Sequence, residues 1–260
     1  MTANITSSWC LNIGQSDLYL IKKMMLYVIF CLTSISVYSD EIQERETVTL
    51  GTILFPPGTN IEKESGRCIG NNIDKTRQIL LHLNIDINIV CTSPIRIYRM
   101  IENNELDFTI NIKSTSALAP HVEFTNKPFR KIILNIYRYK EIPVIGSIAA
   151  VRGFDYNGFR QVYLNKDVEF LDLPNTISAI QMFARKRSDA LLSYQTPMEY
   201  YLALKNIELG DSVVVETLLT LDTFYAINKN SPYFEMLKSS LDDFAQKEKL
   251  NYFIEFGIEK

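Results

Sequence analysis

The chain has 260 residues, of which 47% are hydrophobic and 22% charged, and its 27 basic residues nearly balance 30 acidic residues. The apolar fraction excludes an intrinsically disordered chain, and 10 Gly and 9 Pro are too few for a fibrous or low-complexity protein. A net charge of −3 without a run of basic residues offers no surface for the phosphates of a nucleic acid, so we expect no nucleic-acid partner.

The amino-terminal segment is predicted to direct export. Lys22 and Lys23 precede the apolar run 24–32, and Ser39 lies at the expected cleavage point. A positive start, a short apolar stretch and small residues before the cleavage point are the three parts of a secretory signal. We therefore expect 1–39 to be a leader and signal peptide and the mature protein to lie in the periplasm. The alternative is an uncleaved membrane anchor, which needs about 20 apolar residues and hence a longer stretch.

Two cysteines remain after this cleavage, Cys68 and Cys91, in a compartment where disulfides persist. One bridge is possible, because Cys68 precedes the first predicted helix and Cys91 ends the adjacent predicted strand. A metal site would need more ligands than these cysteines and the two histidines, His82 and His121. Hydrolase and nucleotide-binding motifs such as GxSxG and GxGxxG are absent as well. We therefore expect no metal and no cofactor.

Strands and helices alternate along the mature chain, in the order that builds a mainly parallel sheet with helices on both faces. The first block is predicted as a strand over 48–54, a helix that begins after Gly70-Asn71-Asn72 with an Asn as its cap, a strand over 85–91, a helix over 94–103 and a strand over 107–112. The segment 113–128 that follows is predicted to be a loop.

A second block with the same alternation follows the strongest β pattern of the chain, 131–137. It is predicted as a strand over 145–151, a short helix over 156–163, a strand over 168–171, a helix over 175–186 with Ile177, Ile180 and Ala184 inward, and a strand over 189–193. A helix over 196–204, strands near 213–216 and 224–228, and a helix over 232–246 complete the chain. Two successive blocks predict two lobes with a cleft between them.

Five short motifs follow one another along 48–260. They are Val48-Thr-Leu-Gly-Thr52, Gly70-Asn-Asn-Ile-Asp74, Arg96 with Met100-Ile-Glu-Asn-Asn-Glu-Leu-Asp107, Phe124-Thr-Asn-Lys-Pro-Phe129, and Arg187-Ser-Asp-Ala-Leu-Leu192. In this order and spacing they resemble the bacterial extracellular solute-binding proteins of family 3, the periplasmic receptors of ABC importers.

This resemblance implies an α/β protein with the type II periplasmic-binding-protein fold. Lobe one would comprise 45–138 and 225–260, lobe two 139–224, with two crossing strands as the hinge. The protein would be a monomer without enzymatic activity that captures a small polar solute and delivers it to an ABC permease or a sensor protein in the inner membrane. Two alternatives remain: an enzyme of the same fold, since related dehydratases use a carboxylate in the cleft, and a signalling module with a degenerate cleft.

The resemblance places the ligand in the loops at the carboxyl ends of the strands, where open α/β sheets bind ligands. The expected ligand-binding residues are Phe55, Pro56, Ser93, Arg96, Asn111, Lys113, Ser114 and Thr115 in lobe one and Arg152, Asp155, Tyr156, Ser193, Tyr194 and Gln195 in lobe two. Phe55 is a candidate stacking surface, with core packing as its alternative. Arg152 is a candidate anion-binding residue, with a solvated surface position as its alternative. Asp107 and Asp189 are expected to be structural.

One departure from the family concerns the ligand. Amino-acid-binding members carry an arginine about six residues before the Phe of the Phe124-Thr-Asn-Lys segment, where it pairs with the ligand's carboxylate. This chain has Leu118 at that position, and Lys113 is the only cation of the loop 113–126 that can substitute. The sequence therefore argues against a standard α-amino acid as the ligand.

Overall fold

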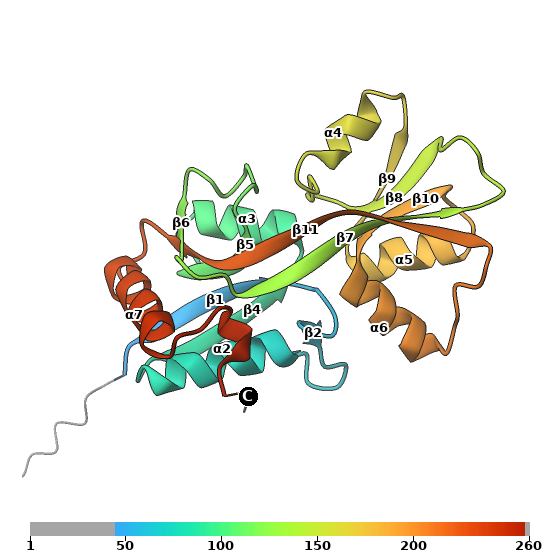
Figure 1. Ribbon diagram of the computed structural model, residues 1–260. Helices are drawn as coiled ribbons and strands as arrows, with labels where there is room; N and C mark the ends of the chain where they lie inside the picture. Colours follow the sequence, from blue (N-terminus) through green and yellow to red (C-terminus); the bar gives the residue numbers. More distant parts are fainter. Residues whose placement is uncertain (1–44, 258–260) are drawn as a thin grey trace, which may run out of the picture. The chain divides into compact units, whose positions relative to one another are not determined.

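The computed structural model describes residues 45–257 (Figure 1), and the predicted signal peptide, 1–39, lies outside this range. A single large sheet organises the described residues. Its strands are β1 (Thr47–Ile53), β4 (Asp86–Thr92), β5 (Phe108–Ile112), β6 (Val122–Phe124), β7 (Arg130–Tyr139), β8 (Ser147–Val151), β9 (Glu169–Leu173), β10 (Ala190–Tyr194) and β11 (Val213–Asn228). Their order is β4-β1-β5-β11-β7-β10-β8-β9, with β6 paired to β11.

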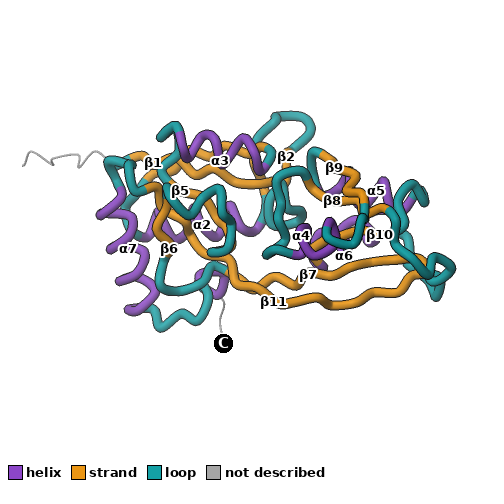
Figure 2. Tube along the Cα trace, turned by 90° about the horizontal axis from the view of Figure 1, so that it is seen from above, coloured by secondary structure: helices purple, strands orange, loops and turns teal. Residues whose placement is uncertain are grey.

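Two long strands, β7 and β11, connect the two ends of this sheet and run side by side (Figure 2). They pair antiparallel to each other, and we call them the ribbon. Beyond β11 lie the parallel strands β5, β1 and β4, which with their helices form the first half (47–112). Beyond β7 lie β10, which pairs antiparallel to it, and then β8 and β9, parallel to β10, which form the second half (147–194).

Helices cover both faces of the sheet. They are α2 (Asn71–His82), α3 (Pro94–Glu102), α4 (Phe159–Leu164), α5 (Thr176–Ala184), α6 (Gln195–Lys205) and α7 (Phe234–Lys247), followed by a short 3-10 turn η1 (Phe253–Glu255). Successive residues of a strand point to opposite faces. Leu50 of β1 accordingly packs with Leu80 of α2, whereas the neighbouring Gly51 lies against Ile97 of α3. A Cβ at Gly51 would lie 2.2 Å from the Leu106 side chain, so a larger residue there would require Leu106 to move.

The second half repeats this arrangement. Alternate residues of β8 divide between two clusters of buried side chains. Ile148 packs with Tyr156 and Val168 near α4, and Ala149 packs with Ile180 and other apolar residues of α5 and α6. The α/β class and the alternation predicted from the sequence are therefore confirmed.

The structure corrects three details of the predicted elements. The predicted loop 113–128 contains the short strand β6. The two strands predicted near 213–216 and 224–228 are one strand, β11, because no glycine or proline interrupts the segment between them. In α5 the expected inward residue Ala184 is exposed, and the buried side chains belong to Thr176, Ala179, Ile180 and Phe183.

The predicted asparagine cap of α2 is also wrong. The N-cap is Gly70, with φ of 129° and no side-chain cap bond. A Cβ there would lie 2.5 Å from the backbone oxygen of Gly58, so only glycine fits this approach of the two segments. Asn72, which the prediction offered as a cap, is instead buried in the second position of the helix.

Equivalent aspartates brace the two halves. A carboxylate oxygen of Asp107 accepts from the backbone N–H of Thr49, at 2.7 Å, and the other accepts from the Ser231 hydroxyl, at 2.6 Å. Asp189 accepts from the backbone N–H groups of Gly146 and Ser147, at 2.9 and 2.8 Å. Both carboxylates thus tie the third strand of a half to its first strand, and the predicted structural role of the two aspartates is confirmed.

A disulfide joins Cys68 of the small strand β3 (Cys68–Ile69) to Cys91 of β4. Strand β3 pairs with β2 (Asn60–Ile61) in a two-stranded hairpin that precedes α2. The bridge therefore fastens this hairpin to the edge of the main sheet.

Candidate functional site

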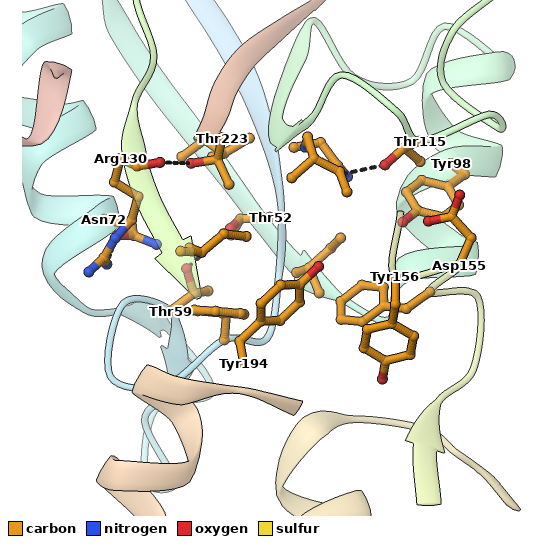
Figure 3. A pocket seen from close by; sticks show the side chains of 17 residues that line it. Thr52, Thr59, Asn72, Tyr98, Thr115, Arg130, Asp155, Tyr156, Tyr194 and Thr223 are labelled. Carbon is orange, nitrogen blue, oxygen red and sulfur yellow. Dashed lines mark hydrogen bonds between the residues drawn. The ribbon is translucent and has the colours of Figure 1, made fainter. Parts of the chain in front are cut away.

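A pocket lies at the junction of the first half, the ribbon and the second half (Figure 3). Residues from all three parts line it: Thr52, Ile53, Phe55, Thr59, Asn72, Tyr98, Ile110, Asn111 and Ile112 of the first half, Thr115 just after it, Arg130, Ile132 and Thr223 of the ribbon, and Phe154, Asp155, Tyr156 and Tyr194 of the second half. The cavity volume is about 70 Å³. Pockets for drug-sized ligands measure roughly 300–1,000 Å³, so this cavity suits a small solute.

Six of the residues expected from the sequence lie on the pocket wall: Phe55, Asn111, Thr115, Asp155, Tyr156 and Tyr194. They come from the segments that follow β1, β5 and β8 and from the last residues of β5 and β10. The carboxyl ends of the strands therefore do contribute to the pocket, as the rule for open α/β sheets predicts.

Three cations expected at the site lie outside the pocket wall. Arg96 is exposed on α3, and Arg152 is exposed, with its guanidinium near the backbone oxygen of Asp172 at 3.3 Å. The exposed Lys113 places its ammonium over the ring of Phe224, 4.1 Å from the ring centroid. Long charged side chains gain hydration at the surface, and here these three remain there.

The other five expected residues also lie elsewhere. Ser114 is exposed, Ser93 precedes α3 as its N-cap residue, and Pro56 is buried and lines a separate groove near Asn175. The buried Ser193 hydroxyl donates to the backbone oxygen of Tyr194, at 3.2 Å. The Gln195 amide donates to Glu199 along α6, at 2.6 Å. Local hydrogen bonds thus satisfy the last two side chains away from the pocket.

Aromatic rings form the second-half wall. The Tyr194 ring centroid lies 5.4 Å from that of Phe55 and 6.1 Å from that of Phe154. Phe154 in turn meets Tyr156 edge-on at 5.5 Å. Burial raises the pKa of the Tyr98 hydroxyl to about 12, and burial also raises the pKa values of Tyr156 and Tyr194. These tyrosines therefore remain neutral at physiological pH.

A strained turn brings Asp155 to the pocket. Tyr156, Asn157 and Gly158 all have positive φ, of 52°, 57° and 85°. The turn is stabilised by the Asp155 carboxylate, which accepts from the N–H of Asn157 at 3.1 Å, and by the Tyr156 hydroxyl, which accepts from the N–H of Val151 at 2.7 Å. Non-glycine residues with positive φ are unfavourable, and such strain is concentrated at functional sites.

Two hydrogen-bond donors on the opposite wall have no partner among the described residues. They are the Nε of Arg130 and the Nδ2 of Asn111, both buried. The Asn111 amide nevertheless lies close enough to the Tyr98 hydroxyl to lower the pKa of that hydroxyl, against the larger effect of burial. Other groups of these side chains are engaged: Arg130 Nη1 donates to Asn72 Oδ1 at 2.9 Å, and Asn111 Oδ1 accepts from the Thr115 hydroxyl at 2.8 Å. Burial also lowers the pKa of Arg130. A buried donor without a partner is costly, so both atoms are poised to meet an acceptor.

Sequence reasoning missed the pocket residues that lie on the strands themselves. Arg130 begins β7, and its i+2 neighbour Ile132 lines the pocket beside it, whereas Lys131 points to the other face, toward the ring of Tyr252. The alternation along β7 was visible, but it does not say which face opens into a pocket.

The charged groups of the pocket are one guanidinium, Arg130, and one carboxylate, Asp155. In the part of the chain that the structure describes, no three His, Cys, Asp or Glu residues are grouped so that they would hold a metal ion. No helix in that part is long and apolar enough to cross a membrane. The pocket therefore offers one positive group, one negative group and aromatic surface.

Comparison with known proteins identifies the fold. No protein-family model matches the chain, and no curated protein matches it either. Solved structures do match. An ancestral arginine-binding protein bound to arginine has a TM-score of 0.66 and 18% identity, over 82% of this chain and 99% of that chain. An ancestral amino acid-binding protein, a precursor of cyclohexadienyl dehydratase, has a TM-score of 0.63 and 20% identity, over 81% and 92%.

A third match is an ABC uptake transporter substrate binding protein from Streptococcus pneumoniae with bound histidine, with a TM-score of 0.63 and 17% identity, over 78% of this chain and 87% of that chain. All three similar structures are amino-acid-binding proteins. The type II periplasmic-binding-protein fold predicted from the sequence is thereby confirmed, over most of the chain.

Proposed function

We propose that this protein is a periplasmic solute-binding protein that captures a small polar solute and delivers it to an ABC importer or a membrane sensor. The observation that carries the proposal is the pocket, which is lined from both halves of the sheet while β7 and β11 connect those halves. A ligand that contacts both walls favours the arrangement in which the walls are close together. The similar structures with bound arginine and histidine support a small-molecule ligand.

The proposed lobes are 45–138 with 225–260, and 139–224, with the ribbon as the hinge. Hinge closure around a ligand is a common way to signal occupancy, because only the closed form presents both lobes correctly to a partner. We propose that the protein acts as a monomer and that an ABC permease or a sensor in the inner membrane recognises this closed form. The predicted signal peptide, 1–39, supports the periplasmic location.

An enzyme of the same fold is the second candidate, because one similar structure is a precursor of cyclohexadienyl dehydratase. General acid–base catalysis needs a positioned proton donor or acceptor, and Asp155 is the carboxylate that the pocket offers. Chromatography of the solute after incubation with the protein separates the candidates: a binding protein returns it unchanged, and a dehydratase converts it.

A thermal-shift screen tests the proposal. The purified protein would be unfolded and refolded to remove carried ligand and then heated with amino acids, organic acids, polyamines and oligopeptides. A ligand at a hundredfold its Kd adds about 2.7 kcal/mol to the free energy of unfolding, which raises the melting temperature by about 5 °C or more. A folded sample that shows no shift with any compound would contradict the proposal.

A further inference from the structure

We infer that the pocket selects a small zwitterion whose anionic and cationic groups lie at opposite ends of the molecule, as in an ω-amino acid. Arg130 would bind the carboxylate, and Asp155 would face the ammonium group. This inference rests on the proposed function, since it names the ligand class of the same pocket.

The pocket wall contains buried hydrogen-bond donors without a partner in the described part of the chain. Of the buried side-chain atoms without a hydrogen-bond partner in 45–257, two belong to residues of the pocket wall, Arg130 Nε and Asn111 Nδ2. Asn111 lies beside Thr115 and Tyr98, on the Asp155 side of the pocket, whereas Arg130 Nε is a donor on the other side. The ligand group that meets Arg130 Nε must therefore be an acceptor. A carboxylate provides acceptor oxygens and a charge opposite to that of the guanidinium, and charge-assisted hydrogen bonds of this kind are the strong ones.

Two hydrogen bonds fix the position of Arg130. Its backbone oxygen accepts from the Thr223 hydroxyl at 3.1 Å, and its Nη1 is fixed by Asn72 at 2.9 Å, so strand and helix hold the side chain in place. Arg130 forms no salt bridge with any acid among residues 45–257. A partly buried cation without a counter-ion is therefore available to a ligand anion.

Arg130 supplies the guanidinium of the pocket wall, and the loop 113–126 supplies none. Leu118, in the loop 113–126, is fully buried in a cluster with Ile97 and Ile101 and offers no charge to the pocket. The guanidinium of this pocket comes instead from the first residue of β7. The anionic group of the ligand is therefore expected beside the ribbon, and not beside the loop 113–126.

Asp155 lies at the other end of the pocket from Arg130. Asp155 likewise has no salt-bridge partner in the described residues, and its charge contributes to the raised pKa values of Tyr98 and Tyr194, after burial. A carboxylate next to neutral aromatic rings attracts a cation, because the faces of the rings add a cation–π contribution. This end of the pocket therefore suits an ammonium group.

The separation of the two ends defines the ligand class. Figure 3 shows Arg130 and Asn72 on one side of the pocket and Asp155 on the other, with Thr52 and Tyr194 between them. An α-amino acid with a neutral side chain carries its ammonium and carboxylate groups on the same carbon atom, so it cannot place one at each end. An ω-amino acid carries them at the two ends of an apolar chain, which would lie along the threonine and aromatic walls.

Titration calorimetry with matched compounds tests the inference. The series would be β-alanine, γ-aminobutyrate and δ-aminovalerate, compared with alanine, α-aminobutyrate, butyrate and butylamine. We expect at least one ω-amino acid to bind about tenfold or more tightly than every other compound, because only these compounds place an opposite charge at each end. Tighter binding of the α-amino acids, or of butyrate or butylamine, would overturn the inference and leave the proposed function standing. If no compound of the series binds, although the broader thermal-shift panel yields a ligand, the inference fails alone.

Variants then assign the carboxylate to its residue. Arg130→Gln should weaken binding of the best ω-amino acid by about tenfold to a hundredfold and leave the weak binding of butylamine unchanged. Arg130→Lys should restore part of the affinity. The matched control is Lys131→Gln, which removes the neighbouring charge from the opposite face of the same strand. Equal losses for Arg130→Gln and Lys131→Gln, with both variants melting like the parent protein, would contradict the role of Arg130.

Discussion

The two halves of the sheet share a framework and differ in the chemistry at its carboxyl end. In each half the first strand lies between the second and the third, and an aspartate before the third strand accepts from an N–H of the first strand, from Thr49 through Asp107 and from Ser147 through Asp189. The frame is therefore independent of the ligand. What differs is the set of residues that follows the strands.

The first half and the adjoining end of the ribbon contribute hydroxyls, amides, a guanidinium and the rings of Phe55 and Tyr98, whereas the second half contributes Asp155 and three aromatic rings. Donors without partners occur on the first wall, and a carboxylate without a salt bridge occurs on the second. Neither wall alone complements a molecule that carries both a positive and a negative group. If the protein binds a solute as proposed, its specificity would arise from pairing two unlike surfaces on similar scaffolds.

The largest change in melting temperature is expected when the disulfide of the first half is removed. The first half carries the Cys68–Cys91 disulfide, which spans 23 residues of sequence. Closing a loop of this length stabilises the folded state by about 3 kcal/mol, chiefly by constraining the unfolded chain. Reduction, or the double variant Cys68→Ser with Cys91→Ser, should lower the melting temperature by about 6–12 °C in calorimetry. An unchanged melting temperature on reduction would show that the bridge does not constrain the chain.

The braces test whether the halves are equivalent. Asp107→Asn and Asp189→Asn each weaken charge-assisted hydrogen bonds to backbone N–H groups, so each should lower the free energy of unfolding by about 2–3 kcal/mol in urea denaturation. A matched control is Asp86→Asn, an exposed residue at the edge strand β4. A large effect at one brace with none at the other would show that the two frames are not energetically alike.

The stability of the fold at alkaline pH should depend on the buried Tyr98 hydroxyl of the pocket wall. Burial raises the pKa of Tyr98 from its ordinary value of about 10 to about 12. The folded state therefore binds this proton more tightly than the unfolded state, and the stability is intact below about pH 10 and decreases as pH rises to 12. The loss should be on the order of 2 kcal/mol and smaller in Tyr98→Phe. Identical pH profiles for the parent and Tyr98→Phe would contradict the burial of this hydroxyl.

The smallest expected effect concerns the approach of the two walls. Gly153 has φ of 88°, and a Cβ there would lie 2.8 Å from Ile95 at the start of α3. Gly158, in the same loop, has φ of 85° but open space around it. Each Gly→Ala change should cost about 1 kcal/mol of stability through the backbone. Only Gly153→Ala should also weaken solute binding, by severalfold, because it separates the walls. Equal affinities of the two variants would show that this contact is not part of the closed pocket.

Much of the frame could be predicted from the sequence, because burial imposes a period on the chain. The strand containing Leu50 and the helix containing Ile79 were predicted within a residue or two. Local exceptions were not predictable. Gly70 replaces an asparagine cap because of a segment 12 residues earlier, Gly58, whose approach depends on tertiary contacts.

The site was predictable where it follows strand ends and hidden where it lies on the strands. Asp155 and Tyr194 were found because loops after strands carry function in open sheets. Ile132 and Thr223 were missed because an inward-facing residue that lines a pocket has the same period as one that fills the core. Arg96 and Arg130 illustrate the remaining difficulty, since only the fold shows which arginine is exposed.

Hydrogen exchange measured by mass spectrometry, with and without the solute that raises the melting temperature, tests whether the solute contacts both halves of the sheet. If the solute bridges unlike walls, exchange should slow both in 52–59 of the first half and in 152–158 of the second half, while the exposed segment around Val144 stays unchanged. Protection of one wall alone, or of neither, would contradict a pocket that works by joining the two halves.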